Sequence, residues 1–347
     1  MNLLELDKSK LYDVLIALPE QIKEACRIGE GLGGKIKIVP NKVLILGMGG
    51  SAIAGDLLRN YLSNLEGGKH IQIVVNRDYD IPHYIDKDWL VIASSYSGNT
   101  EETITAMKSA ENKTKNIIGI CTGGKLENYL KINEYPVIKI PGGLQPRAAI
   151  AYSFFPLLYL MVLNGAIKEV GINEIAISIN KILELTKEQV KIFKEESEEN
   201  QAYIIARNVF EYMPIIYTSS KYEVVNLRWR GQFQENSNIP SFGSILPEMN
   251  HNEINALDYS KLKEFYFFIL KDKYENERVE KRFNFLIDLF KKNKLKFATI
   301  ELNDKNILVN YFEFIQLADW ISFWMGLMRG EDPTEIKNIM ALKEYMS

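Results

Sequence analysis

The chain has 347 residues, a length that favours two domains of ordinary size over one large core. The formal net charge is −3, with 42 Lys and Arg against 45 Asp and Glu, and no basic cluster lies on one periodic face, which argues against nucleic acid or an anionic membrane as a partner. No run approaches the length of a membrane span and the N-terminus lacks the pattern of a signal peptide. Cys26 and Cys121 have no paired spacing, so we expect a cytoplasmic protein without a disulfide framework.

The first half alternates short apolar runs rich in β-formers with helical stretches between residues 42 and 140. The runs are KVLILG, IQIVV, WLVIASS, NIIGICT and PVIKI. Because each run is almost wholly apolar, it suits a strand covered on both faces, as in a doubly wound parallel sheet. A very apolar helix follows Pro146, and Pro156 is expected to kink or divide it.

The second half repeats this pattern after a polar stretch, residues 172–208, which is expected to form one long helix or a pair. The later elements are PIIYTSS at 214–220, FYFFIL from 265, KFATIEL from 296, and a final apolar helix through Trp320 and Trp324. The strand, turn and helix at 214–234 echo those at 43–60, which indicates an internal structural repeat. We therefore predict an α/β protein of two doubly wound modules, residues 1–165 with a leading helical segment and residues 166–347 with linking helices.

Two predicted strands end in unusual turns, each followed directly by a helix. The first turn is GMGGSA at 47–52, which fits neither the dinucleotide fingerprint nor the P-loop, and the second is SSYSGNTEE at 94–102. Helix capping explains Asn99 or Thr100 but leaves Ser95 and Ser97 unexplained. Glycine backbone, neutral hydroxyls and helix N-termini can bind a phosphate dianion without a metal, so adjacent turns of this kind predict a phosphomonoester site.

The two turns resemble the phosphate-binding segments of the sugar-isomerase (SIS) domain. That resemblance implies that each half of the chain is a SIS module and that a phosphosugar is the substrate. The residues it implies at the sugar phosphate are Gly49, Gly50, Ser51, Ser95, Ser97 and Thr100.

Aldose–ketose isomerisation needs a carboxylate base, a cation near the developing oxyanion and an acid/base that opens the sugar ring. Arg147 ends the rigid loop PGGLQPR, where it could equally pair with a surface acid. Glu235 follows a helical stretch and precedes the helix-ending NSN, although most glutamates in such places are solvated. His251 lies in the polar segment PEMNHNE, where a histidine is free to titrate near neutral pH.

Four further segments narrow the resemblance to the bifunctional phosphoglucose/phosphomannose isomerases, from about Lys42 to the C-terminus. They are GGLQPRAAIAYSF, GQFQENSN, PEMNHNEI and EDPTEIKNIMALK. The resemblance implies that Glu235 is the base, that His251 assists ring opening, that Arg147 steadies the enediolate and that Lys343 contacts the substrate. It implies that Thr334 leaves room for the C2 epimer.

The same resemblance implies a homodimer with active sites between the modules, to which His251 is supplied across the dimer contact, and neither cofactor nor metal. One position departs from the family pattern: Glu335 stands where a second proline is usual. Lys337 therefore competes with Lys343 for the substrate.

Three other functions are weighed against this one. A non-catalytic SIS protein that senses a phosphosugar would leave Glu235 and His251 idle, and nothing before Lys42 resembles a helix-turn-helix. An isomerase of another phosphosugar, such as glucosamine 6-phosphate, fits the second half poorly. A zinc-dependent mannose-6-phosphate isomerase would need more ligands than His251 and Glu253 supply.

Overall fold

The computed structural model describes residues 3–33, 41–65, 71–167 and 170–346. Contacts divide the chain into two compact units, residues 17–183 (the first module) and residues up to 16 together with those from 184 onward (the second module). Helix α7 (Ile172–Phe193) crosses the division. The module boundary predicted at 165/166 precedes this helix and stays a prediction.

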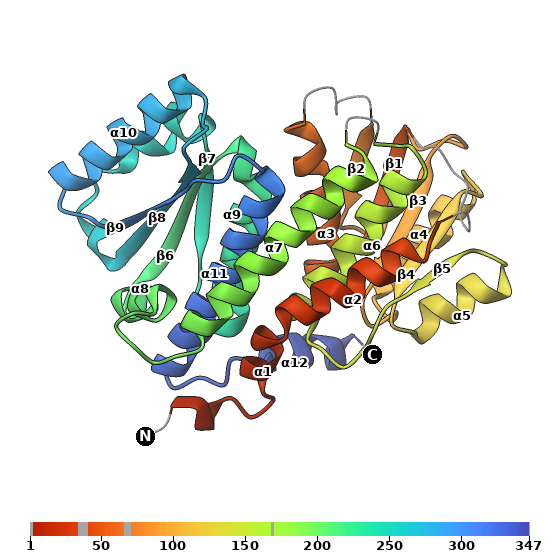
Figure 1. The fold of residues 1–347 in the computed structure, drawn as a ribbon, viewed down its shortest axis with the longest axis horizontal. Coiled ribbons are helices and arrows are strands. Elements are labelled where there is room, and N and C mark those ends of the chain that lie inside the picture. The colour runs from red at the N-terminus through yellow and green to blue at the C-terminus, as the bar shows by residue number, and fades with distance from the viewer. Residues whose placement is uncertain (1–2, 34–40, 66–70, 168–169, 347) are drawn as a thin grey trace. The chain divides into compact units, whose positions relative to one another are not determined.

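The first module contains a parallel sheet of five strands in the order β2-β1-β3-β4-β5 (Figure 1). The strands are β1 (Lys42–Leu46), β2 (Gln72–Asn76), β3 (Leu90–Ser95), β4 (Ile117–Cys121) and β5 (Val137–Lys139). Each of the five apolar runs forms one strand, so this part of the fold prediction is confirmed. Every residue of β3 and β4 is buried, as expected for strands covered on both faces.

Helices cover both faces of the first sheet. They are α2 (Leu18–Glu30), α3 (Gly49–Ser63), α4 (Glu101–Glu111), α5 (Gly124–Ile132) and α6 (Ile150–Leu163), with a short 3-10 helix η3 (Pro146–Ala148). Helices α4 and α5 pack on the face that carries Leu44 and Val91, while α3 packs against Ile45 on the other. Helix α6 continues through Pro156, so the expected division there is wrong: residues 150–161 are all buried, and this packing compensates for the missing backbone hydrogen bond.

The second module contains a parallel sheet of four strands in the order β7-β6-β8-β9. The strands are β6 (Met213–Ser219), β7 (Phe242–Leu246), β8 (Phe265–Asp272) and β9 (Lys296–Leu302). The order matches that of the first four strands of the first module, which confirms the internal repeat. Strand β7, which takes the place of β2, was not predicted.

The second module contains helices on both faces of its sheet and others away from it (Figure 1). They are α1 (Leu11–Ile16), α8 (Gln201–Val209), α9 (Glu223–Asn236), α10 (Glu277–Lys292), α11 (Ile307–Met328) and α12 (Lys337–Tyr345), with the 3-10 helices η1 (Leu3–Leu6), η4 (Ser220–Tyr222), η5 (Glu248–His251), η6 (Glu253–Ala256) and η7 (Ser260–Glu264). Phe290 of α10 packs on Phe267 of β8, and Trp229 of α9 packs on Phe268, the next residue of that strand. Since successive strand residues face opposite sides, α10 and α9 lie on opposite faces.

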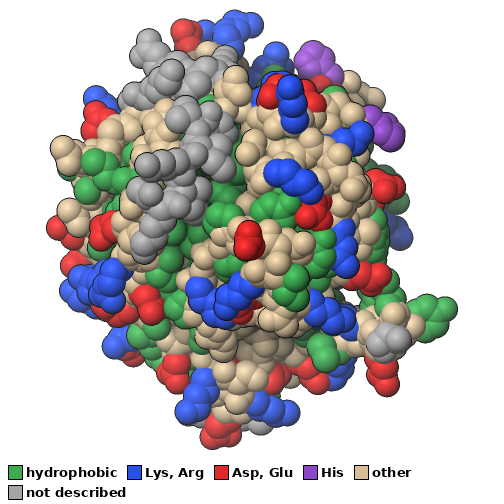
Figure 2. Space-filling view, turned by 90° about the vertical axis from the view of Figure 1, so that its right-hand side faces the viewer, with side chains coloured by type: hydrophobic (Ala, Val, Ile, Leu, Met, Phe, Trp, Pro, Cys, Tyr) green, Lys and Arg blue, Asp and Glu red, His purple; other side chains and the backbone are tan. Residues whose placement is uncertain are grey.

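The polar stretch at 172–208 forms a pair of helices, α7 and α8. No helix in the described part of the chain is long and apolar enough to cross a membrane. On the face shown in Figure 2, acidic and basic side chains are interspersed and no region of one sign dominates.

Candidate functional site

The glycine-rich and the hydroxyl-rich turn come together at the carboxyl edge of the first sheet. Strands β1 and β3 are adjacent and parallel, so the turns that follow them end at the same edge. The backbone N–H of Tyr96 donates a hydrogen bond of 3.0 Å to the Oγ of Ser51, which joins the two turns directly. The convergence on which a phosphate site depends is therefore present.

The hydroxyl groups of the second turn differ in what they can offer a ligand. Ser97 is exposed, and its Oγ accepts a hydrogen bond from the N–H of Asn99 at 3.2 Å. Ser95 is buried, and its Oγ lies 2.8 Å from the Oγ1 of the half-buried Thr100. Ser95 therefore orients Thr100, whereas Ser97 and Thr100 can present a hydroxyl to an anion.

Helices α3 and α4 begin at these turns with free capacity for an anion. Neither the residue that precedes α3, Met48, nor the one that precedes α4, Thr100, caps its helix with a side chain in the described structure. The first N–H groups of each helix and the positive ends of both helix dipoles point out of the sheet edge. This is the arrangement that binds phosphate at helix N-termini.

Arg147 lies beside the glycine-rich turn. A Cβ placed on Gly50 would be 2.5 Å from the carbonyl oxygen of Pro146 and 3.3 Å from the nitrogen of Arg147, so only glycine allows this approach. The loop before Arg147 is tied to the hydroxyl-rich turn, because the N–H of Leu144 donates to the hydroxyl of Tyr96 at 3.0 Å. The first module thus brings both turns and Arg147, which is 3% exposed, to one place.

Glu235 lies in the last turn of α9, whose end is fixed to α11. The side chain of Asn236 donates to the hydroxyl of Ser322 at 3.0 Å, and the hydroxyl of Ser237 donates to the carbonyl of Ser322 at 2.7 Å. One turn earlier, Gln232 donates to Asp319 at 2.6 Å. The backbone that carries the half-buried Glu235 is therefore anchored, which suits a residue that must hold a functional position.

Glu235 lines a cavity of about 480 Å³ in the second module, a volume within the range of small-molecule sites. Its other lining residues come from the end of α9 with the loop that follows it, and from the segment that enters α12: Gln234, Asn238, Ile239, Pro240, Glu331, Glu335, Ile336, Lys337, Asn338 and Ile339. The residue predicted to be the base therefore opens into a cavity, and its catalytic role stays a prediction.

Of the C-terminal residues predicted to lie near the substrate, only some line this cavity. Lys337 lines it, paired with Glu335 at 2.9 Å, whereas Lys343 is exposed and lies outside the lining. Lys343 follows Ile339 of α12 by four residues, about one helical turn, and so lies on the same side of the helix as this lining residue. Thr334 is buried, and both its N–H and its hydroxyl donate to Asp332, at 3.0 and 2.6 Å.

His251 and Glu235 lie at opposite edges of the second sheet. Gln234, next to Glu235, donates to the carbonyl of Ser241 at 2.9 Å, directly before β7 begins. His251 follows the end of β7 at Leu246, which pairs with the last residue of β6. The five residues of β7 separate the two by about 13 Å along the strand.

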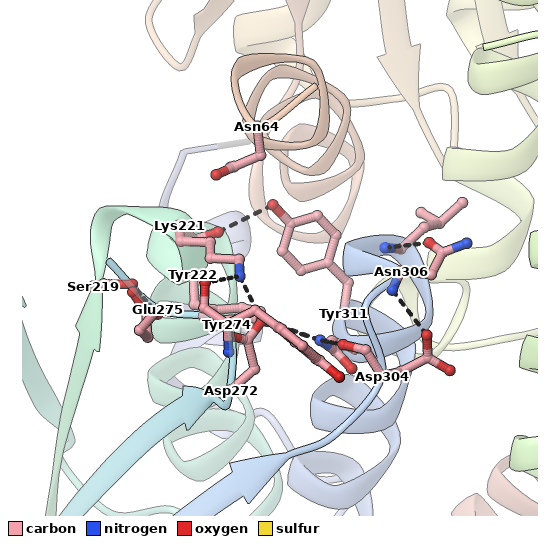
Figure 3. Close-up of polar contacts among 12 residues, drawn as sticks. Asn64, Ser219, Lys221, Tyr222, Asp272, Tyr274, Glu275, Asp304, Asn306 and Tyr311 are labelled. Carbon is pink, nitrogen blue, oxygen red and sulfur yellow. Dashed lines mark hydrogen bonds and ion pairs between the residues drawn. The ribbon is translucent and has the colours of Figure 1, made fainter. Parts of the chain in front are cut away.

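The carboxyl edge of the second sheet carries charge of the opposite sign to a phosphate site. Figure 3 shows Ser219, at the end of β6, donating to Glu275 at 2.6 Å, and Lys221 paired with Asp272 at 2.6 Å. Tyr222 donates to the same oxygen of Asp272. Where the first sheet has hydroxyls and open helix ends, the second has two carboxylates already bonded within the protein, and these would repel a phosphate dianion.

The sequence analysis considered Glu253 only as a zinc ligand and missed that this residue, two positions after His251, bridges β6 and β7. Its carboxylate accepts hydrogen bonds from Tyr217 and Ser244. The signal that could have found it is the pair of acids flanking a lone exposed histidine, Glu248 and Glu253. Within the described residues, no group of three or more His, Cys, Asp and Glu side chains is placed to hold a metal ion.

Most of the chain matches known families and proteins. Residues 198–346 match the family described as the bacterial phospho-glucose isomerase C-terminal SIS domain, and residues 38–128 match the SIS domain. A bifunctional phosphoglucose/phosphomannose isomerase of Caldicellulosiruptor bescii is 39% identical over 343 residues, which are 97% of this chain and 99% of the relative. A protein of the same name from Aquifex aeolicus is 30% identical, over 88% of this chain and 90% of the relative.

A solved structure shares the fold at low sequence identity. The tagatose-6-phosphate ketose/aldose isomerase of Escherichia coli superposes with a TM-score of 0.70 at 12% identity, over 93% of this chain and 95% of the other. At this identity the likeness supports the architecture of two parallel sheets and nothing finer.

Proposed function

This chain belongs to the bifunctional phosphoglucose/phosphomannose isomerase family, and we propose that it interconverts glucose 6-phosphate and mannose 6-phosphate with fructose 6-phosphate. The reaction is an aldose–ketose isomerisation through a cis-enediol or enediolate. The single observation that carries the proposal is the hydrogen bond from Tyr96 to Ser51, which joins two anion-binding turns at one sheet edge. A phosphosugar thereby has a site for its phosphate.

The proposed chemistry divides between the modules. The first supplies the phosphate turns and Arg147, whose guanidinium steadies the negative oxygen of the enediolate. The second supplies Glu235, which removes the proton from C2 of the aldose and returns it to C1. The proton of the C2 hydroxyl passes to the C1 oxygen by way of the enediol, so that the base is regenerated and a ketose forms. Lys343 contacts the substrate and Thr334 leaves room for the C2 epimer in this proposal.

We further propose that His251 acts in the active site of a second copy in a homodimer. The separation of His251 from Glu235 by the length of β7 supports this, because a histidine exposed at the far edge is available to another chain. His251 would protonate the ring oxygen of the sugar and take the hydroxyl proton as the ring opens.

The proposed setting is the cytoplasm, in the interconversion of hexose phosphates in glycolysis and gluconeogenesis, with neither nucleic acid nor membrane as a partner. The near-neutral charge balance and the mixed charges of the surface support it (Figure 2).

Incubation of the purified protein with fructose 6-phosphate in deuterated water tests the proposal. We expect both glucose 6-phosphate and mannose 6-phosphate, with deuterium at C2, detected by proton NMR. Formation of glucose 6-phosphate without mannose 6-phosphate would contradict the proposed activity on mannose 6-phosphate. Binding without any product would favour the phosphosugar sensor and contradict an isomerase.

A further inference from the structure

The turn that carries His251 is attached to the second sheet through Glu253. Tyr217 of β6 and Ser244 of β7 are direct partners in the strand register. Both donate their hydroxyl hydrogens to Glu253, one to each carboxylate oxygen. A single side chain therefore bridges two neighbouring strands and holds the turn above them.

The donors of this bridge are fixed in the core. Tyr217 is fully buried, and its ring stacks on Phe267 at 6.0 Å between centroids. Burial, reinforced by the hydrogen bond to Glu253, raises the pKa of Tyr217 far above the usual value for tyrosine, so the phenol stays protonated and remains a donor. With both oxygens engaged, Glu253 is poorly placed to act as a base itself.

Other side chains fix the backbone of the same turn. Asn252 accepts a hydrogen bond from the N–H of Glu253 and donates to Glu248 at 3.2 Å. From α10, Arg282 approaches the amide oxygen of Asn250 at 3.4 Å. His251 is exposed in the middle of this segment, so its backbone is fixed while its imidazole is free to meet a substrate.

We propose that Glu253 is the positioning residue of His251: it fixes the histidine-bearing turn on strands β6 and β7 and does not itself touch the substrate. This inference rests on the ring-opening role proposed for His251. A proton donor held within a narrow range of positions keeps its contact with the ring oxygen, whereas displacement by about 1 Å can cost a hundredfold in rate.

A double-mutant cycle on turnover of glucose 6-phosphate tests the proposal. We expect His251→Ala to lower kcat by about a hundredfold or more, and Glu253→Gln, which leaves one hydroxyl without an acceptor, to lower it by about tenfold. Because Glu253 acts through His251, the double variant should be as slow as His251→Ala alone. The KM of Glu253→Gln should change little, because Glu253 does not itself touch the substrate.

Glu275→Gln is the matched control, since it alters a carboxylate that also accepts a hydroxyl hydrogen bond at the end of β6, from Ser219. We expect its kcat and pH profile to match those of the unaltered protein. Ser244→Ala, which removes one donor and keeps the carboxylate, provides a milder variant should Glu253→Gln fold poorly, with an expected loss of a few-fold that also vanishes in the His251→Ala background.

Failure of the positioning role of Glu253 can be told apart from failure of the role proposed for His251. Independent, multiplicative losses in the cycle would overturn the positioning role of Glu253 and leave the isomerase proposal intact. If His251→Ala itself turned over at the normal rate, the ring-opening role of His251 would be wrong, and the positioning role with it.

Discussion

The hydrogen bond from the N–H of Tyr96 to the Oγ of Ser51 joins residues 45 positions apart in the chain, at the ends of two adjacent strands. Each turn alone is a weak signal, because glycine-rich and serine-rich turns are common before helices. Joined, they place two open helix N-termini at one point. Substitutions in and around this arrangement give the clearest tests of function.

Glu235→Gln keeps the shape of the side chain and removes the base. We expect kcat to fall by about a thousandfold or more while phosphosugar binding is largely retained, measured by steady-state kinetics and calorimetry. Glu331→Gln, in the same cavity, is the control, with an expected loss below about tenfold. Equal rates for Glu235→Gln and the unaltered protein would remove Glu235 from the mechanism.

Gly50→Ala should disrupt the phosphate turn, because the new methyl group would meet the Pro146 carbonyl at 2.5 Å and backbone cannot move aside cheaply. We expect kcat/KM to fall by at least about tenfold. Gly31→Ala in the same module, where the nearest atom would be 3.4 Å away, should stay within about twofold. Similar behaviour of the two variants would show that Arg147 need not approach the turn.

Lys343→Met and Lys337→Met, measured side by side, separate the two candidate lysines. We expect Lys343→Met to lower kcat/KM by about a hundredfold. Lys337→Met should cost less than about tenfold, because this ammonium is paired with Glu335 at 2.9 Å and exposed. The reverse order would assign the substrate contact to Lys337.

Turnover should survive chelation, since a carboxylate base and an arginine suffice for an enediolate mechanism. The measurement compares initial rates with and without prolonged dialysis against EDTA. Full inactivation that is restored by zinc would contradict the mechanism proposed for Glu235.

Glu275 should make the second module less stable as pH rises. Burial raises its pKa above the ordinary 4.5, against the lowering effects of the Ser219 hydrogen bond and the Lys221 charge. The folded state therefore retains a proton that the unfolded state loses, and the free energy of unfolding falls as pH rises from about 4.5 through the raised pKa. Glu275→Gln should abolish this slope in urea titrations at successive pH values. An unchanged slope would assign it to other groups.

The sequence predicted the strands of the first sheet and the glycine-rich and hydroxyl-rich turns that follow two of them, because their signals are local: apolar runs that end in glycine or hydroxyl groups. Strand β7 escaped prediction because its five residues include Gly243 and Ser244 and only Leu246 is buried. Its pairing depends on a distant residue, Asn226, which donates to the carbonyls of Ile216 and Ser244 at 2.8 and 3.1 Å.

Long-range contacts account for the remaining differences. The N-terminal segment joins the second module through contacts such as that of Tyr12 with Trp320, 5.7 Å between ring centroids, which no periodicity reveals. Among the predicted phosphate residues, which stay a prediction, Ser95 is buried beside Thr100 whereas Ser97 is exposed, a distinction that depends on side-chain direction. The anchoring role of Glu253 is likewise invisible until Tyr217 and Ser244 are paired.

The shared strand order of the two sheets, set beside the opposite charge at their carboxyl edges, separates architecture from chemistry. Strand order and register depend on the residues within the strands, whereas ligand preference depends on the few that follow them. One half of a chain with such a repeat can therefore carry acids such as Glu275, in the loop after β8, where the other half carries hydroxyls, on the same framework of strands. In protein engineering, charged residues of the loop after β8 can accordingly be substituted while the sheet beneath the loop stays unchanged.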